Sequence, residues 1–453
     1  MSRLDVLIDD LAKRIDGLKG IPLASSAIFA ISFSSFFAFY DITNYAYIAP
    51  VLKSTFSVGD NEIAVGASTT VIGYVIGAFV ITVFADSNGR RPALIASTLI
   101  LGIGSLLAAF SQDMVQMSIF RLLTGIGIGS EIAVASAYIG EMSPKSKRGK
   151  YTSIVIVLGW VGLASSGPIS LMLIQQGNNV AGIDGWRAVL AIPSIAAFLS
   201  LLFRIRMPES PRWLLSKNRL GETNTVLASL NIRPLERKHD YAATTFAKNN
   251  HRRKNRWHHL LKNRTIATRI ALLIAVWVCI FVPVYASLLL VVEYINQGYS
   301  LTDSISINII SGIGFVVGGI LSIFISERLE RKYQILIASI IMAIGFILRG
   351  ILIHDYAGLV IAGFIAFGAN AWLVSSLYAY TAEVFPTRIR TFGFGIIEGS
   401  SRAISSIGPF IFVLLSPFGF LNTMVAISLF CFGAATIILI GPHTRGRSLE
   451  SLN

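Results

Sequence analysis

Two charged side chains fall inside long apolar stretches, where an unpaired charge is costly if the stretch crosses a membrane. Asp41 lies in the stretch 26–52, and Arg121 lies in the stretch 114–140. If the two stretches cross in opposite directions, Asp41 lies ~15 Å and Arg121 ~10 Å from the same face. The matched depths predict that Asp41 pairs with Arg121 and that protonation of Asp41 releases Arg121. This chemistry suits a proton-coupling site, and a static structural ion pair is the alternative.

Further polar side chains at similar depth could take part in the same site or bind a solute. Glu131 is predicted to share protonation with Asp41 or to contact the solute. Glu398 and Arg402 lie four residues apart, so a salt bridge within one helix is one interpretation. The other is that Arg402 is a forked donor to the carboxylate of a solute. Side chains near the midplane complete the candidate binding site, with helix packing as their alternative: Trp160, Tyr285, Asn370 and Trp372.

A pattern of small and charged residues occurs twice, with an offset of 241 or 242 residues. The first copy contains Gly73, Gly77, Asp86, Gly89, Arg90, Arg91, Glu141 and Arg148, and the second contains Gly314, Gly318, Glu327, Arg331, Glu383 and Arg390. The charges lie at the ends of apolar stretches, where ion pairs between helices are predicted to gate a conformational change. Charge that only sets the topology of short loops is the alternative. Gly89 belongs to the predicted gating set. The glycines that could be mistaken for a dinucleotide fingerprint are interpreted as helix contacts: Gly125, Gly127, Gly129, Gly312, Gly314 and Gly318.

The length and number of the apolar stretches predict an all-α membrane protein. Of 453 residues, 54% are hydrophobic and 14% are charged, and the mean hydropathy is +0.68. A spanning helix takes about 20 apolar residues. Twelve stretches qualify: 26–52, 62–85, 92–112, 114–140, 151–176, 186–207, 266–293, 303–326, 333–353, 357–382, 391–415 and 419–441. Six lie in each half, so the repeat predicts two six-helix bundles that rock against each other.

The distribution of the net charge of +14 excludes several classes of partner. Of the 38 Lys and Arg residues, 33 lie in the tails and the even-numbered connections, which predicts that both termini are cytoplasmic. This pattern favours an anionic lipid surface over nucleic acid. The histidines of the basic run 251–259 lack carboxylates or thiols at ligand spacing, so no metal site is predicted. No phosphate-cradling loop is present at 149–151, and no cofactor is expected.

Four segments are predicted along the chain. Residues 1–207 form an N-terminal six-helix bundle, preceded by an amphipathic helix on the inner membrane surface. Residues 208–265 form a basic cytoplasmic linker with short helices. Residues 266–441 form a C-terminal six-helix bundle, and residues 442–453 form a cytoplasmic tail.

With these motifs the chain resembles the major facilitator superfamily over essentially its whole length. The run 86–91 (DSNGRR) is similar to the loop after helix 2, and 121–129 (RLLTGIGIG) is similar to the helix 4 pattern. Segments 138–149 and 208–215 (PESPRWLL) resemble motifs shared by the sugar porters and the organic-acid and organic-ion branches. The resemblance implies a twelve-helix secondary transporter in the cell membrane, with an acid–arginine pair in its proton-coupled members.

The same resemblance leaves the solute open between branches. The stretch 277–294 lacks the paired glutamines, the glycine and the asparagine that sugar porters place in helix 7. The run 380–387 (YTAEVFPT), followed by Arg402, resembles the metabolite and aromatic-acid proton symporters. The leading expectation is proton-coupled symport of a small organic acid by a monomer that is not an enzyme. A sugar or polyol porter is the first alternative, and a non-transporting membrane sensor or scaffold on the same fold is the second.

Overall fold

The predicted apolar stretches each coincide with a helix or with a broken helix in the computed structural model. The structure describes residues 3–23, 25–144, 148–175, 179–180, 182–235, 264–325, 328–384 and 390–443. In the first half the helices are α2 (Ser25–Thr55), α3 (Asp60–Asn88), α4 (Arg90–Ala109), α5 (Met114–Met142), α6 (Arg148–Gln175) and α7 (Gly185–Arg204). In the second half they are α12 (Arg264–Ala286) with η1 (Ser287–Leu289) and α13 (Leu290–Asn296), α14 (Leu301–Ile325), α15 (Arg331–Ile351), α16 (Tyr356–Val384), α17 (Arg390–Ser405) with α18 (Gly408–Leu415), and α19 (Phe420–Ile438).

Most of these helices are long enough and apolar enough to cross a membrane. Ten spans meet length and hydropathy limits among the described residues. The two remaining predicted stretches are helices α2 and α6, of 31 and 28 residues. A helix of that length reaches more than about 30 Å, the thickness of the hydrocarbon core. The fold class predicted from the sequence is therefore confirmed.

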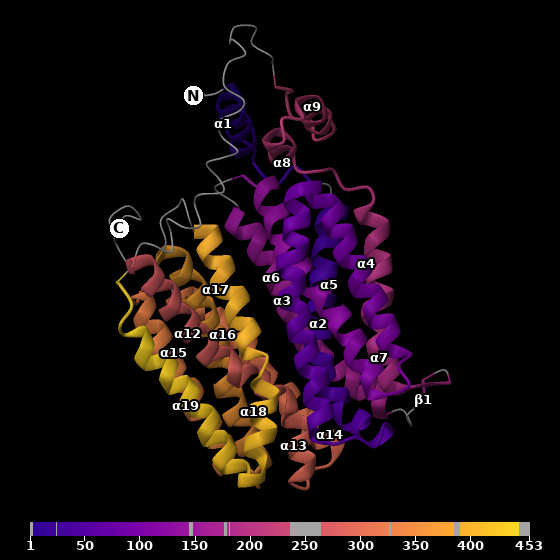
Figure 1. The fold of residues 1–453 in the computed structure, drawn as a ribbon, viewed down its shortest axis with the longest axis vertical. Helices are drawn as coiled ribbons and strands as arrows, with labels where there is room; N and C mark the ends of the chain where they lie inside the picture. The colour runs from indigo at the N-terminus through magenta and orange to yellow at the C-terminus, as the bar shows by residue number, and fades with distance from the viewer. Residues whose placement is uncertain are drawn as a thin grey trace.

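The sequence repeat reappears as a repeat in helix packing. In the N-terminal bundle, α3 packs on α5, α2 on α6 and α4 on α7. In the C-terminal bundle, α14 packs on α16, α12 on α17 and α15 on α19, which is the same arrangement. The two bundles lie side by side, the N-terminal one indigo to magenta and the C-terminal one orange to yellow (Figure 1).

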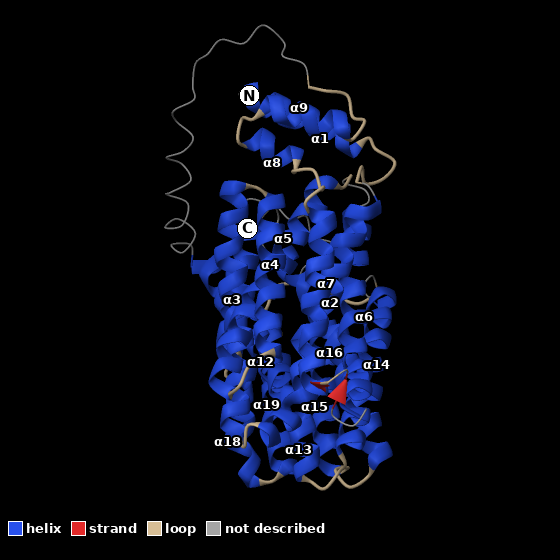
Figure 2. Cartoon of the chain, turned by 90° about the vertical axis from the view of Figure 1, so that its right-hand side faces the viewer, coloured by secondary structure: helices blue, strands red, loops and turns tan. Residues whose placement is uncertain are grey.

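Three short helices gather at one end of the bundles, which we call the linker end: α1 (Arg3–Asp16), α8 (Pro211–Ser216) and α9 (Leu220–Ser229) (Figure 2). The predicted amphipathic helix is present as α1. Its residues Leu11 and Ile15, however, are 1% exposed and pack against Leu215 and Leu227 of the linker. The linker covers this apolar face where the sequence predicts a lipid surface. The opposite end carries α13 and a short hairpin of β1 (Asn179–Val180) and β2 (Ile183–Asp184).

Glycines allow the closest helix contacts in both bundles, as interpreted from the sequence. A Cβ on Gly77 would overlap the carbonyl oxygen of Ile126, and a Cβ on Gly129 would overlap that of Tyr74. In the second bundle a Cβ on Gly318 of α14 would overlap the carbonyl oxygen of Gly368 on α16. The repeated glycines therefore set how closely α3 approaches α5 and α14 approaches α16.

Gly318→Ala is expected to lower the thermal stability of the purified protein by the equivalent of about 1–3 kcal/mol, because the new methyl group forces two backbones apart. The neighbouring Gly319 provides a matched control, since a Cβ there would meet no atom within 4 Å. Gly319→Ala should leave the melting temperature unchanged or raise it slightly, because alanine favours a helix over glycine. Equal melting temperatures for the two variants would contradict the proposed packing role of Gly318.

Candidate functional site

The structure places Asp41 of α2 against Arg121 of α5, at matched depth and fully buried. The Nη1 of Arg121 donates to Oδ1 of Asp41 at 3.0 Å, and its Nη2 donates to the backbone oxygen of Asp41 at 3.0 Å. The Nε of Arg121 donates to Thr70 of α3. Asn44 and Ser105 donate to the two carboxylate oxygens of Asp41, at 2.7 and 3.2 Å. Helices α2, α3, α4 and α5 thus all contribute to one buried polar cluster.

This cluster has the physical properties that a proton-coupling site requires. The Asp41 and Arg121 side chains are 0% and 1% exposed, so each depends on the other to compensate its lost hydration. Protonation of Asp41 would remove the negative charge and leave Arg121 as an uncompensated cation. The cluster could then keep its geometry only at a large free-energy cost. The coupling role itself remains a prediction.

A second buried ion pair holds Glu131 inside the N-terminal bundle. Its oxygens accept from both terminal nitrogens of Arg204 on α7, the contact to Oε2 being 2.7 Å. Ser97 of α4 donates to the same oxygen at 2.9 Å, and Arg204 also donates to the carbonyl of Leu94. Both carboxylate oxygens of Glu131 are therefore occupied by donors of the protein, and its part in proton coupling or in solute contact stays a prediction. In the sequence, Arg204 looks like one of the basic residues next to the linker. Its position inside the apolar stretch 186–207 is the signal that could have identified it as the partner of a buried carboxylate.

Arg402 of α17 lies at the centre of a polar and aromatic cluster. Its Nε and Nη2 donate to Oε1 of Glu398 at 3.3 and 3.2 Å, so the salt bridge within α17 is formed. Its Nη1 donates to the hydroxyl of Tyr285 at 2.9 Å. The hydroxyl of Tyr378 donates to Glu398 at 2.8 Å. The predicted residues Arg402, Glu398 and Tyr285 are thus brought together, and Tyr378 was not foreseen.

Both bundles contribute aromatic rings to Arg402. The guanidinium carbon lies 4.5 Å from the ring centre of Tyr74 on α3 and 4.6 Å from that of Phe281 on α12. A cation between two ring faces is stabilised by both ring quadrupoles. Because Tyr74 belongs to the N-terminal bundle and Phe281 to the C-terminal bundle, relative motion of the bundles must change the surroundings of Arg402.

The other predicted lining residues lie in two different settings. Trp160 of α6 stacks on Phe315 of α14, with ring centres 5.7 Å apart, so it lies between the bundles. Asn370 and Trp372 of α16 contact α15 instead: the Asn370 amide reaches Met342, and the Trp372 indole donates to Gln334 at 3.3 Å. The structure does not bring these two side chains into contact with Arg402.

At the linker end, the charged residues of the first repeat form one network. Arg90 contacts Asp86 at 2.6 Å and Glu141 at 2.8 Å, so it joins α3, α4 and α5. Glu209 of the linker accepts from the backbone nitrogens of Arg90 and Arg91 at the start of α4. Burial raises the pKa of the Glu209 carboxyl, and these N–H donors act in the opposite direction. Sequence reasoning missed this capping role of Glu209.

Gly89 allows the carboxylate of Glu209 to come close to the start of α4. Its φ of 120° lies in a region that side chains rarely adopt, and a Cβ would overlap the Glu209 carboxylate. In the second half, Arg331 begins α15. Glu327 lies outside the described residues, as do the side chains of Arg148, Glu383 and Arg390. The gating role of both sets of charges stays a prediction.

Arg90→Glu is expected to favour conformations open at the linker end, because it places three carboxylates together where an ion-pair network joined three helices. The measurement is the labelling rate of single cysteines introduced at each end of the bundles. Lys13→Glu is the control, since Lys13 forms an exposed pair with Asp9 within α1. Unchanged labelling at both ends would mean that Arg90 only sets the membrane topology of its loop.

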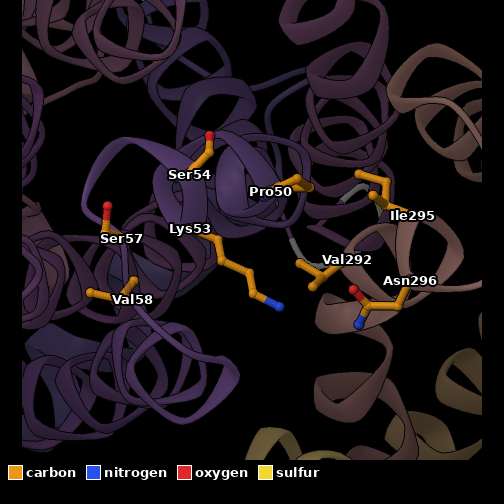
Figure 3. A pocket seen from close by; sticks show the side chains of 8 residues that line it. All are labelled: Pro50, Lys53, Ser54, Ser57, Val58, Val292, Ile295 and Asn296. Carbon is orange, nitrogen blue, oxygen red and sulfur yellow. The ribbon is translucent and has the colours of Figure 1, made fainter.

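At the opposite end both bundles line an open pocket of about 430 Å³ (Figure 3). Its walls come from α2 and the turn that follows it, with Lys53 and Val58, and from α13, with Val292 and Asn296. Lys53 forms an ion pair of 2.6 Å with Asp60 at the start of α3. The bundles therefore meet around a partly polar pocket at this end.

Comparison with known proteins agrees with this architecture. A model of the family described as "sugar (and other) transporter" matches residues 27–453. A putative metabolite transport protein of Bacillus subtilis is 26% identical over 97% of this chain and 96% of that protein. The arabinose-proton symporter of the same organism is 26% identical, with 88% of each chain covered. The niacin transporter of Acinetobacter baylyi is 24% identical over 98% of this chain and 99% of that protein.

Solved structures show the same fold. The xylose transporter of E. coli in a partially occluded inward-open conformation superposes with a TM-score of 0.74 at 20% identity, covering 93% of this chain and 99% of that one. The inward-open conformation of the same transporter superposes with a TM-score of 0.73 at 20% identity, covering 94% of this chain and 98% of that one. With two repeated helical bundles among the described residues and a family match over nearly its whole length, the chain belongs to the sugar (and other) transporter family, and it is a multi-pass membrane transporter of the major facilitator superfamily.

Proposed function

We propose that this protein is a proton-coupled symporter of a small organic acid that works by alternating access between the two bundles. The observation that carries the proposal is the buried Asp41–Arg121 pair, in which one proton changes the charge balance of four packed helices. The names of two relatives, the arabinose-proton symporter and the niacin transporter, support proton coupling and an acidic solute respectively.

We place the solute at Arg402, where side chains of both bundles meet. A guanidinium with several N–H donors can bind a carboxylate in a forked, charge-assisted contact. The rings of Tyr74 and Phe281 hold the guanidinium between them, and the hydroxyls of Tyr285 and Tyr378 beside it would give the solute further polar contacts. Substrate sites of this kind combine apolar walls with a few convergent polar groups.

A sugar or polyol is the second candidate, and one specific observation favours it. Glu398 already neutralises Arg402, so an incoming carboxylate must compete with an existing ion pair. A neutral solute with several hydroxyls could instead bind to the pair as it stands, donating to Glu398 and accepting from Arg402. The xylose and arabinose transporters among the relatives agree with this alternative.

The orientation in the membrane is part of the same proposal. The excess of Lys and Arg in the tails and the even-numbered connections supports a cytoplasmic location for α1, α8, α9 and both chain termini. The pocket lined by Lys53 and Asn296 then faces the outside. The bundles 1–207 and 266–441 would move about the central site as units, and one chain is sufficient for transport.

The experiment combines a ligand screen with a transport assay. Purified protein is heated in the presence of organic acids, including nicotinate, or of arabinose, xylose and other sugars; a ligand at about 100 times its dissociation constant should add roughly 2.7 kcal/mol of stability. The ligand identified is then offered to proteoliposomes with an imposed pH gradient, with and without a protonophore. Accumulation that persists after the protonophore collapses the gradient would overturn proton coupling. Stabilisation by sugars alone would replace the organic-acid assignment with the second candidate.

A further inference from the structure

Arg349 on α15 is a buried cation for which the described part of the chain supplies no counter-charge. Its side chain is 0% exposed, and none of its three guanidinium nitrogens has a hydrogen-bond partner there. Two other fully buried arginines among the described residues differ from it. Arg121 is paired with Asp41, and Arg204 is paired with Glu131.

The surroundings of Arg349 are tight and contain donors. A Cβ on Gly363 of α16 would overlap both Nη2 of Arg349 and the hydroxyl of Ser311 on α14, so these two groups lie next to each other in the space that Gly363 leaves. The ring of Tyr294 on α13 packs against that of Tyr299, whose hydroxyl donates to the carbonyl of Ile353 just after α15, and the buried hydroxyl of Tyr294 has no partner among the described residues. The site lies towards the opposite end of the C-terminal bundle, away from Arg402.

The physical problem is that a guanidinium stays protonated in a protein. Burial removes its hydration, and breaking or omitting the partner of a buried charge is strongly destabilising. One contact partly stabilises the charge of Arg349: the centre of the Phe367 ring lies 4.6 Å from the guanidinium carbon. A cation–π contact is weaker than the lost hydration of the guanidinium. The N–H groups at its edge remain without an acceptor.

We propose that the guanidinium of Arg349, together with the hydroxyl of Tyr294, binds a small monovalent anion of the size of chloride. Both groups can donate to an anion, and a guanidinium has no acceptor atom that would repel one. A compact anion could reach the N–H groups of the guanidinium while the ring of Phe367 stays in contact with it. The anion would supply the counter-charge that Asp41 and Glu131 supply to the other buried arginines. This inference does not rest on the proposed transport function.

The test measures thermal unfolding of the purified full-length protein in sodium chloride and in sodium gluconate of equal ionic strength. Chloride should raise the melting temperature of the wild type with a saturating dose dependence, because a ligand that binds only the folded state stabilises it. Gluconate is too large to replace it. Arg349→Gln should give the same melting temperature in both salts. Tyr294→Phe should require several-fold more chloride for half of the full effect.

Arg187→Gln is the matched control at the same end of the molecule. Arg187 has a carboxylate partner in Asp184, so this variant should keep the full response to chloride. Line broadening of the chloride-35 NMR signal by the wild-type protein, reversed by excess bromide, measures binding without unfolding. This second measurement keeps the test decisive if Arg349→Gln does not fold. Identical melting curves of the wild type in both salts, or a chloride response retained in Arg349→Gln, would overturn the proposal.

Discussion

Asp41→Asn is expected to abolish proton-driven accumulation of the solute while leaving exchange of solute across the membrane largely intact. Asparagine is permanently neutral and has nearly the shape of a protonated aspartate. The variant therefore resembles the protonated carrier, in which Arg121 is no longer held by a carboxylate. Movement with bound solute remains possible, but no proton is released to drive it in one direction.

The measurement compares uptake against a concentration gradient with counterflow exchange in the same proteoliposomes. Asp113→Asn is the matched control, because Asp113 caps the start of α5 through Gln116 and asparagine caps a helix about as well as aspartate. That variant should transport as the wild type does. If Asp41→Asn still concentrates the solute when a pH gradient is imposed, Asp41 is not the coupling residue.

Hydropathy and the internal repeat were sufficient to predict the spans, because membrane thickness fixes the length of a spanning helix. They were not sufficient to predict where a span breaks. The stretch 266–293 is continuous by hydropathy, yet the α-helix gives way to a 3₁₀ turn at Ser287–Leu289, shortly after Pro283. A second break separates α17 from α18 and precedes Pro409. Proline removes a backbone donor, but neighbouring helices decide whether the helix bends or breaks.

In the candidate site, too, the sequence predicts how deep a side chain lies in the bundle but not which way it points. Counting residues from the ends of two spans gives the depth of each side chain, and this predicted the Asp41–Arg121 contact. Counting does not tell which neighbouring helix a side chain faces. Glu131 lies on the same helix as Arg121 but faces α4 and α7, where it meets Arg204. The partner of Glu131 and the isolation of Arg349 both depend on how the helices are rotated and packed, which the sequence does not specify.

Arg402→Ala is expected to weaken binding of a carboxylate solute by about 2–5 kcal/mol, the range seen when one member of a buried charged pair is truncated. The Arg402 side chain is 14% exposed and lies between two aromatic rings, so water cannot easily replace it. Arg402→Lys should recover little of the affinity, because an ammonium group provides neither the forked geometry nor the planar stacking surface. Solute binding to the purified variants, measured calorimetrically, checks both expectations.

The Glu398→Ala variant and the double variant separate a solute contact from an internal salt bridge. If Arg402 serves only to neutralise Glu398, the double variant should bind better than Arg402→Ala alone, because neither charge is then left without its partner. If Arg402 binds the solute carboxylate, Glu398→Ala should preserve or strengthen binding by removing a competitor, and the double variant should be as weak as Arg402→Ala. The hydroxyl of Tyr378, which donates to Glu398 in the wild type, remains in all variants and does not distinguish them. If the double variant binds the solute about as well as the wild type, Arg402 does not bind a solute carboxylate. A neutral solute, such as a sugar, would then be the better assignment.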